Sequence, residues 1–158
     1  MSRTRAQVVE ALAEAGLVLP EVNTPLADYR PSIRSGLLVQ VSGQLPMREG
    51  ALAYTGTLGS AGLPIVEGQQ AASLCALGLI AAAFVDVGEQ EALACAKVNV
   101  YVAVDQRFTD MPLVANGASK VLGIAFGAPH ARSAVGVCSL PLGAPVEVDG
   151  VFTVDPTA

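Results

Sequence analysis

The residues best suited to chemistry lie in segment 130–137, which begins His-Ala-Arg-Ser and continues as an alternating strand. Arg132 shares one face of this predicted strand with Ala134 and Gly136, and Val135 points to the other face. Because Ala134 and Gly136 are small, we expect open space beside the guanidinium. A planar guanidinium with open space beside it can hold a small carboxylate by both oxygens. The alternative is a structural ion pair or a position at a sheet edge.

Two further segments, 97–105 and 146–154, alternate valines with polar side chains and predict strands with one buried face. Glu147 and Asp149 share the more polar face of the second segment. We expect the polar face of the sheet to carry four candidate residues: Ser42, Tyr101, Arg132 and Asp149. A half-apolar sheet face is seldom left in water, so we expect other subunits to cover it.

The composition indicates one globular domain, because 158 residues with 52% apolar and 15% charged side chains suffice to bury a core. The net charge of −5 argues against a nucleic-acid partner, whose phosphates require clustered Lys and Arg. The three cysteines are widely spaced in apolar contexts and are interpreted as reduced core residues. A single histidine excludes a multi-histidine metal centre, so no metal site is expected.

No targeting or membrane segment is predicted. The N-terminus lacks the apolar stretch of a signal peptide. The most membrane-like run, residues 68–85, is uncharged but rich in Ala and Gly, and Glu67 and Asp86 flank it instead of basic residues. We interpret this run as a buried helix of a cytoplasmic protein without a membrane partner.

Hydrophobic periodicity predicts an α+β domain in which two long helices cover one face of a mixed sheet. Residues 43–62 are rich in Gly and predict an irregular excursion or a short hairpin. The predicted helices are 5–15, 64–87 and 110–126, and the predicted strands are 33–34, 37–42, 97–105, 133–137 and 146–154.

Four motifs, in this order and spacing, resemble the Rid family of reactive-intermediate imine deaminases, also called YjgF or L-PSP. They are residues 41–46 (Val-Ser-Gly-Gln-Leu-Pro), 129–135 (Pro-His-Ala-Arg-Ser-Ala-Val), 140–141 (Leu-Pro) and 146–149 (Val-Glu-Val-Asp). The resemblance extends from about residue 29 to residue 154. Residues 1–25 and the Asn-Gly-Ala-Ser run at 116–119 are similar to a longer branch with an added N-terminal helix, which would make 26–156 the core of a single domain.

The resemblance implies a chorismate-mutase-like fold and a homotrimer with clefts between subunits. In active relatives, the arginine matching Arg132 pairs with the carboxylate of a 2-imino acid. A serine and a tyrosine matching Ser42 and Tyr29 line the pocket. A glutamate matching Asp149 helps water attack the imine carbon, which releases ammonia and a 2-keto acid. No cofactor is implied.

This sequence departs from the family pattern at the catalytic carboxylate. Asp149 is one methylene shorter than glutamate, which withdraws the carboxylate by about 1.5 Å. Glu147, two residues earlier on the same face, is a possible substitute. Asp149 can equally be an exposed strand acid or an ion-pair partner.

The other candidates also have structural alternatives. Ser42 can donate a hydrogen bond to substrate or to backbone groups of the turn at Gly43. Tyr29 can line the pocket or pack in an interface. The family's pocket asparagine falls near Ala115 or Asn116, and Asn116 can instead bridge backbone groups. His130 is a candidate general base because its reference pKa is near 6.5, or it packs at an interface.

Three functions compete at this point. The first is hydrolysis of small 2-imino or enamine acids without metal or organic cofactor. The second is a trimeric protein that binds small carboxylates without turnover, which the Asp149 departure keeps open. The third is an endoribonuclease or translation inhibitor, as some relatives are named, and the acidic charge and single histidine weigh against it.

Overall fold

The computed structural model describes residues 1–22 and 28–156. The predicted boundary between an extension (1–25) and a core (26–156) falls within 23–27, outside the described residues. The elements are α1 (Arg5–Glu14), β1 (Ser32–Ser35), β2 (Leu38–Gln44), β3 (Met47–Arg48), β4 (Ala51–Leu52), α2 (Ile65–Ala83), β5 (Ala92–Ala103), α3 (Met111–Phe126), β6 (Ala131–Val137), the 3-10 helix η1 (Pro141–Gly143) and β7 (Val146–Asp155).

The main sheet is mixed and has the strand order β1-β2-β7-β5-β6. Strands β5 and β6 run parallel, and every other neighbouring pair is antiparallel. A parallel pair needs a crossover, and α3 supplies it between β5 and β6. The consequence is that β6 is an edge strand whose start lies beside α3, where the candidate arginine sits.

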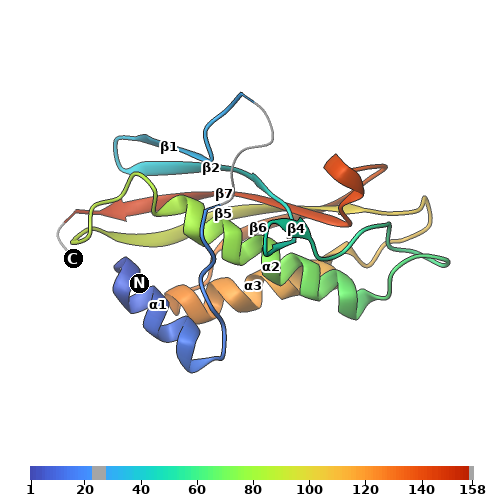
Figure 1. Cartoon of the computed structure of the whole chain (residues 1–158), viewed down its shortest axis with the longest axis horizontal. Coiled ribbons are helices and arrows are strands. Elements are labelled where there is room, and N and C mark those ends of the chain that lie inside the picture. The colour runs from blue at the N-terminus through green and yellow to red at the C-terminus, as the bar shows by residue number, and fades with distance from the viewer. Residues whose placement is uncertain (23–27, 157–158) are drawn as a thin grey trace.

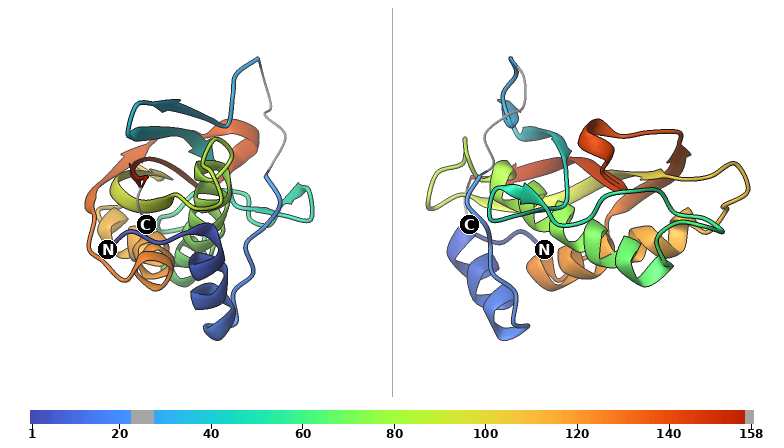
Figure 2. Two further views of the ribbon diagram at one scale, coloured as in Figure 1. Left: turned by 90° about the vertical axis from the view of Figure 1, so that its left-hand side faces the viewer. Right: turned by 45° about the vertical axis from the view of Figure 1, so that its right-hand side comes forward.

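Helices α2 and α3 cover the same face of the sheet, and Figure 1 and the end-on view in Figure 2 show them as one layer beneath the strands. Val98, Val100 and Val102 of β5 are fully buried against this layer. Gly117 allows the two helices to approach closely, since a Cβ at this position would lie 2.0 Å from the backbone oxygen of Gln69. None of the three α-helices lies on the opposite face of the sheet (Figure 1).

Helix α2 is long and apolar enough to cross a membrane by length and composition alone. Its residues Ala71, Cys75 and Leu79 are nevertheless fully buried inside the domain. Contacts with α3, β2 and β7 therefore account for its apolar character, as predicted for a core helix.

The N-terminal segment is tied to the end of α3. Arg3 exchanges two backbone hydrogen bonds with Leu93, of 2.8 and 2.9 Å. Its Nη1 donates to the carbonyl oxygens of Ile124 and Ala125, both at 3.0 Å. These carbonyls belong to the last turn of α3, where no intrahelical donor remains and a positive charge is favourable. Arg3 thus caps the helix that forms one wall of the candidate site.

The predicted fold class is confirmed, and the predicted elements are all present. Two boundaries differ by four residues or more. Helix α2 ends at Ala83, before the predicted stop near residue 87. Strand β5 begins at Ala92, because its first residues pair with Phe152–Asp155 of β7 across a register shift at Cys95/Lys97. The register shift interrupts the alternation of apolar and polar residues, and the strand predicted from that alternation therefore begins only at residue 97.

Candidate functional site

Arg132 is held against α3 by three hydrogen bonds. Its Nη1 donates to Asn116 Oδ1 and to Ser119 Oγ, both at 3.0 Å, and its Nη2 donates to the carbonyl oxygen of Pro112 at 3.3 Å. Asn116 and Ser119 are three residues apart and therefore lie on one face of α3. A guanidinium has five N–H groups. The Nε–H and one Nη2–H therefore take no part in these three contacts.

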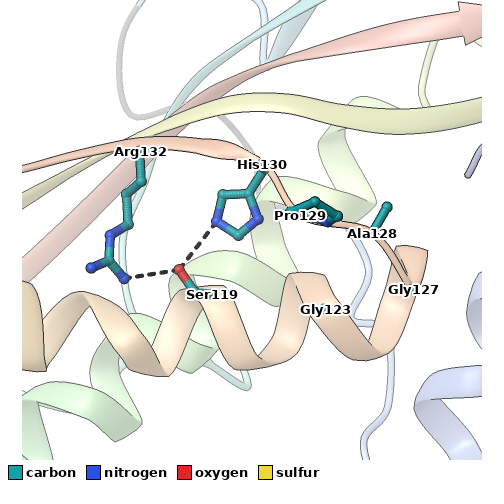
Figure 3. Close-up of a pocket in the computed structure, with 7 residues that line it drawn as sticks. All are labelled: Ser119, Gly123, Gly127, Ala128, Pro129, His130 and Arg132. Carbon is teal, nitrogen blue, oxygen red and sulfur yellow. Dashed lines mark hydrogen bonds between the residues drawn. The ribbon is translucent and has the colours of Figure 1, made fainter.

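The predicted face of Arg132 is wrong. It was expected on the open face of the sheet with Asp149, yet its side chain extends from β6 toward α3, as Figure 3 shows. Gly136 does not supply the open space predicted beside the guanidinium, because a Cβ there would lie 2.7 Å from Val104 Cγ2. The small side of β6, with Ala134 and Gly136, allows this close packing toward α3. Val135 points to the open face and is 44% exposed.

A pocket of about 580 Å³ does open beside Arg132, at the start of β6 next to His130. The polar residues of its lining are Ser119, His130 and Arg132, and the rest of the wall is small or apolar: Gly123, Gly127, Ala128 and Pro129. Its volume falls in the range of small-molecule sites. The site therefore offers one cation and two neutral polar groups to a ligand.

Ser119 joins the two other polar groups of the pocket. Its Oγ lies 3.1 Å from His130 Nε2 and accepts the hydrogen bond from Arg132 Nη1. Partial burial and the positive charge of Arg132 lower the pKa of His130 below its usual value. Both effects favour the neutral imidazole. Its Nδ1 is buried with no hydrogen-bond partner, an arrangement that costs about 1–3 kcal/mol.

Asp149 lies on the opposite, open face of the sheet, as predicted. Its Oδ1 accepts from Asn99 Nδ2 at 2.7 Å, and its Oδ2 accepts from the Tyr101 hydroxyl at 2.8 Å. Asn99 and Tyr101 alternate on β5 and face the same way. The hydrogen bond to Asp149, together with burial, raises the pKa of Tyr101 to about 12. The carboxylate is thus fixed by two neutral donors.

Glu147 lies over Gly43, the bulged residue of the Ser-Gly-Gln motif. A Cβ on Gly43 would overlap the Glu147 carboxylate, so a larger residue there would move the end of this side chain from its present position. Burial, and then the charge of Asp149, raise the pKa of Glu147. Two carboxylates with different environments therefore stand side by side on β7.

Ser42 and Tyr29 do not join Arg132 within one chain. The Ser42 hydroxyl donates to the carbonyl oxygen of Arg30 at 2.8 Å, which ties the loop before β1 to β2. Tyr29 is 44% exposed in that loop. Both lie on the β1–β2 side of the sheet, whereas Arg132 lies on the opposite edge strand.

Comparison with known proteins identifies the family. Residues 9–147 match the model of the family described as YjgF/chorismate mutase-like, putative endoribonuclease. The chain belongs to this family. Protein TCP17 of Trypanosoma cruzi is 40% identical over 149 residues, which is 92% of each chain. The structure of Atu1372 from Agrobacterium tumefaciens, a protein of unknown function, is 36% identical with a TM-score of 0.85, covering 95% of this chain and 94% of that one.

The fold also matches a more distant YjgF-like structure. Escherichia coli TdcF, solved with bound serine, is 20% identical with a TM-score of 0.60, and the match covers 84% of this chain and 93% of TdcF. At that identity the likeness shows the fold alone.

Sequence reasoning about this YjgF-family chain missed Ser119 and Asn99 as site residues. Ser119 stands three residues after Asn116, so helical spacing alone places both on one face. Asn99 stands two residues before Tyr101 on the polar face of a strand. Both signals were present, but nothing in the spacing indicated which residue each would contact. Among the described residues, no cluster of His, Cys, Asp or Glu could hold a metal ion.

Proposed function

We propose that this YjgF-family protein hydrolyses small 2-imino or enamine acids to 2-keto acids and ammonia. The observation that carries the proposal is the guanidinium of Arg132, fixed at a pocket of about 580 Å³ by Asn116 and Ser119. No acidic partner neutralises Arg132 among the described ion pairs. Its free Nε–H and Nη2–H suit the two oxygens of a carboxylate.

The reaction asks little of the protein beyond orientation. Water adds to the imine carbon, the C=N electron pair moves to nitrogen, and ammonia leaves as the carbonyl forms. Fixing the substrate by its carboxylate holds the imine carbon in one place relative to water and removes part of the entropic barrier. TdcF, a protein of this fold, has been solved with serine bound, which supports an amino-acid-like ligand here.

Asp149 is proposed to orient the attacking water from a neighbouring subunit. Within one chain, Asp149 and Arg132 lie on opposite faces of the sheet. We propose that the subunits form a homotrimer in which the open face of one copy meets the β6 edge of the next. Val135 and Leu38, each 44% exposed in the single chain, would be covered in this arrangement. The proposed site is therefore shared between two subunits.

The test is release of ammonia and 2-keto acid from imino acids that an amino-acid oxidase generates in the same tube. The proposal predicts faster release than in buffer alone, and faster still with Asp149→Glu, which restores the reach of the carboxylate. Release at the buffer rate with several short and bulky imino acids would contradict it.

A second function, binding without turnover, is favoured by one observation. Both oxygens of Asp149 already accept hydrogen bonds, from Asn99 and Tyr101. These bonds hold the carboxylate in place and make it less able to take a proton from water. Saturable binding of pyruvate that Arg132→Ala abolishes, without any acceleration of imine hydrolysis, would establish this alternative.

The family description also names endoribonuclease activity. The net charge of −5 gives it no support, because a ribonuclease attracts phosphates with clustered basic residues.

A further inference from the structure

We propose that Ser119 and His130 form a proton relay that takes the proton released when water attacks a ligand bound to Arg132. The inference rests on the proposed function for its substrate. It assigns a chemical step to two side chains that lie in the same pocket as the anchoring guanidinium (Figure 3).

The geometry sets the direction of the relay. Ser119 Oγ accepts a hydrogen bond from Arg132 Nη1 at 3.0 Å, which leaves its own proton free for His130 Nε2, 3.1 Å away. The Arg132 charge also stabilises negative charge on Oγ as that proton departs. Ser119 therefore connects the bound substrate with the imidazole. The attacking water would approach its Oγ.

The proton balance of the step is complete. As the water oxygen bonds to the imine carbon, the C=N electron pair moves to nitrogen. The proton lost by water passes to Ser119 Oγ, while the hydroxyl proton of Ser119 passes to His130 Nε2. The imidazolium then returns this proton through Ser119 to the nitrogen, which gives a carbinolamine with OH and NH2 on the same carbon. In the second half of the step, the same relay carries the hydroxyl proton of the carbinolamine to its nitrogen. The C–N bond then breaks with its electron pair on nitrogen, and ammonia leaves as the carbonyl forms. No oxidant, reductant or further reactant is needed.

The surroundings of His130 keep it able to accept a proton. Arg132 is the charged group that acts on it from β6, and α3 presents the neutral hydroxyl of Ser119. Strand β5 places the exposed Lys97 opposite Ala131. The buried, unpartnered Nδ1 gives the fold no hydrogen bond, and a buried polar atom left in this state calls for a functional explanation.

The chain has one histidine, so proton NMR reports on His130 without assignment. We expect it to titrate below 6.5 in the wild type. Arg132→Ala removes a repelling positive charge and should raise this pKa, and so should saturating pyruvate, whose carboxylate neutralises Arg132. A histidine that titrates at 6.5 or above and responds to neither change would overturn the relay, whatever the activity.

Kinetics supply the second readout. In the wild type, kcat/KM should fall as the pH falls through the His130 pKa, because the relay needs neutral imidazole. His130→Gln should lower kcat about 100-fold, the scale of general-base catalysis, with little change in KM and with the acid limb lost. Ser119→Ala should lower kcat on the same scale and lose the acid limb, and its KM should rise as well because it removes a hydrogen bond that fixes Arg132. The control Ser73→Ala removes a helical serine whose hydroxyl bonds only to the carbonyl oxygens of Gln69 and Gly117 and should keep the wild-type kcat.

The outcomes separate the two proposals. An active wild type whose His130→Gln variant keeps kcat and the acid limb would contradict the relay alone. Variants that raise only KM would show that these residues bind substrate without moving a proton, which also contradicts it. A wild type that does not accelerate imine hydrolysis would contradict the proposed function and the relay together.

Discussion

Arg132 and Asp149 lie on opposite faces of the same sheet: the guanidinium donates to Ser119 on α3, and the carboxylate accepts from Tyr101 on the open face. One chain therefore cannot present both groups to one small substrate. If both act on it, they come from different subunits, and this gives a prediction that a site within one chain does not share.

Subunits carrying Arg132→Ala and subunits carrying Asp149→Asn should complement each other. Each variant alone should be strongly impaired. In randomly mixed trimers, about a quarter of the clefts combine an intact arginine with an intact aspartate, as expected for a heterologous ring interface. Deaminase activity of the co-refolded mixture should rise to that share of wild type. A mixture no more active than its components, or a wild type that sediments as a monomer, would contradict the shared site.

The link between Tyr101 and Asp149 is testable by pH. The hydrogen bond to the carboxylate raises the pKa of Tyr101 to about 12, so the neutral phenol stabilises the folded state below the ordinary pKa near 10, and this contribution disappears as the pH rises through 12. Asp149→Asn should shift one tyrosine of the ultraviolet absorbance titration back toward 10. In Tyr101→Phe that high-pH transition should be missing. An unchanged titration in Asp149→Asn would show that the pair is not formed.

The contact between α2 and α3 predicts opposite results for two glycines of α3. Gly117→Ala puts a Cβ 2.0 Å from the backbone oxygen of Gln69, and such overpacking should lower the free energy of unfolding by about 1–3 kcal/mol. Gly123→Ala is the matched control, because nothing lies within 4 Å of the added Cβ. It should gain up to about 1 kcal/mol of helix propensity. Equal melting temperatures for the two variants would contradict the packing.

The ion pair of Arg34 and Glu91 predicts how stability depends on acid. Arg34 donates to both Glu91 oxygens, at 2.6 and 2.8 Å, and with the Gly88 N–H it lowers the pKa of Glu91 to about 2. The stabilisation is complete above the ordinary value of 4.5 and is lost as the pH falls toward 2. Glu91→Gln should therefore melt below wild type at pH 7, and the gap should close toward pH 2. A gap that does not change with pH would contradict the pair.

Much of this fold follows from periodicity. The alternation of Val98, Val100 and Val102 predicts one buried face of β5, and Gly127, with φ 62°, ends α3 where a left-handed residue is needed. The motifs carried the prediction further, to the correct family and fold class.

Other features depend on contacts between distant segments, which local patterns do not encode. Alternation grouped Arg132, Ala134 and Gly136 correctly but did not show that their face lies toward α3, where small residues allow close packing. The hydrogen bond from Arg132 to Asn116 and the position of Glu147 over Gly43 likewise become visible only in the folded chain.

The most direct test of the carboxylate anchor compares imine hydrolysis by the wild type, Arg132→Ala and Arg132→Lys. The control is Arg107→Ala, an exposed loop arginine. Ammonia and keto-acid release should be accelerated by the wild type and the control. Arg132→Ala, still folded by circular dichroism, should lower kcat/KM about 10- to 100-fold, as expected for the loss of charge-assisted hydrogen bonds. Arg132→Lys should recover only part of this, because lysine lacks the planar fork. Acceleration that persists unchanged in Arg132→Ala would contradict the carboxylate anchor on which the proposed function rests.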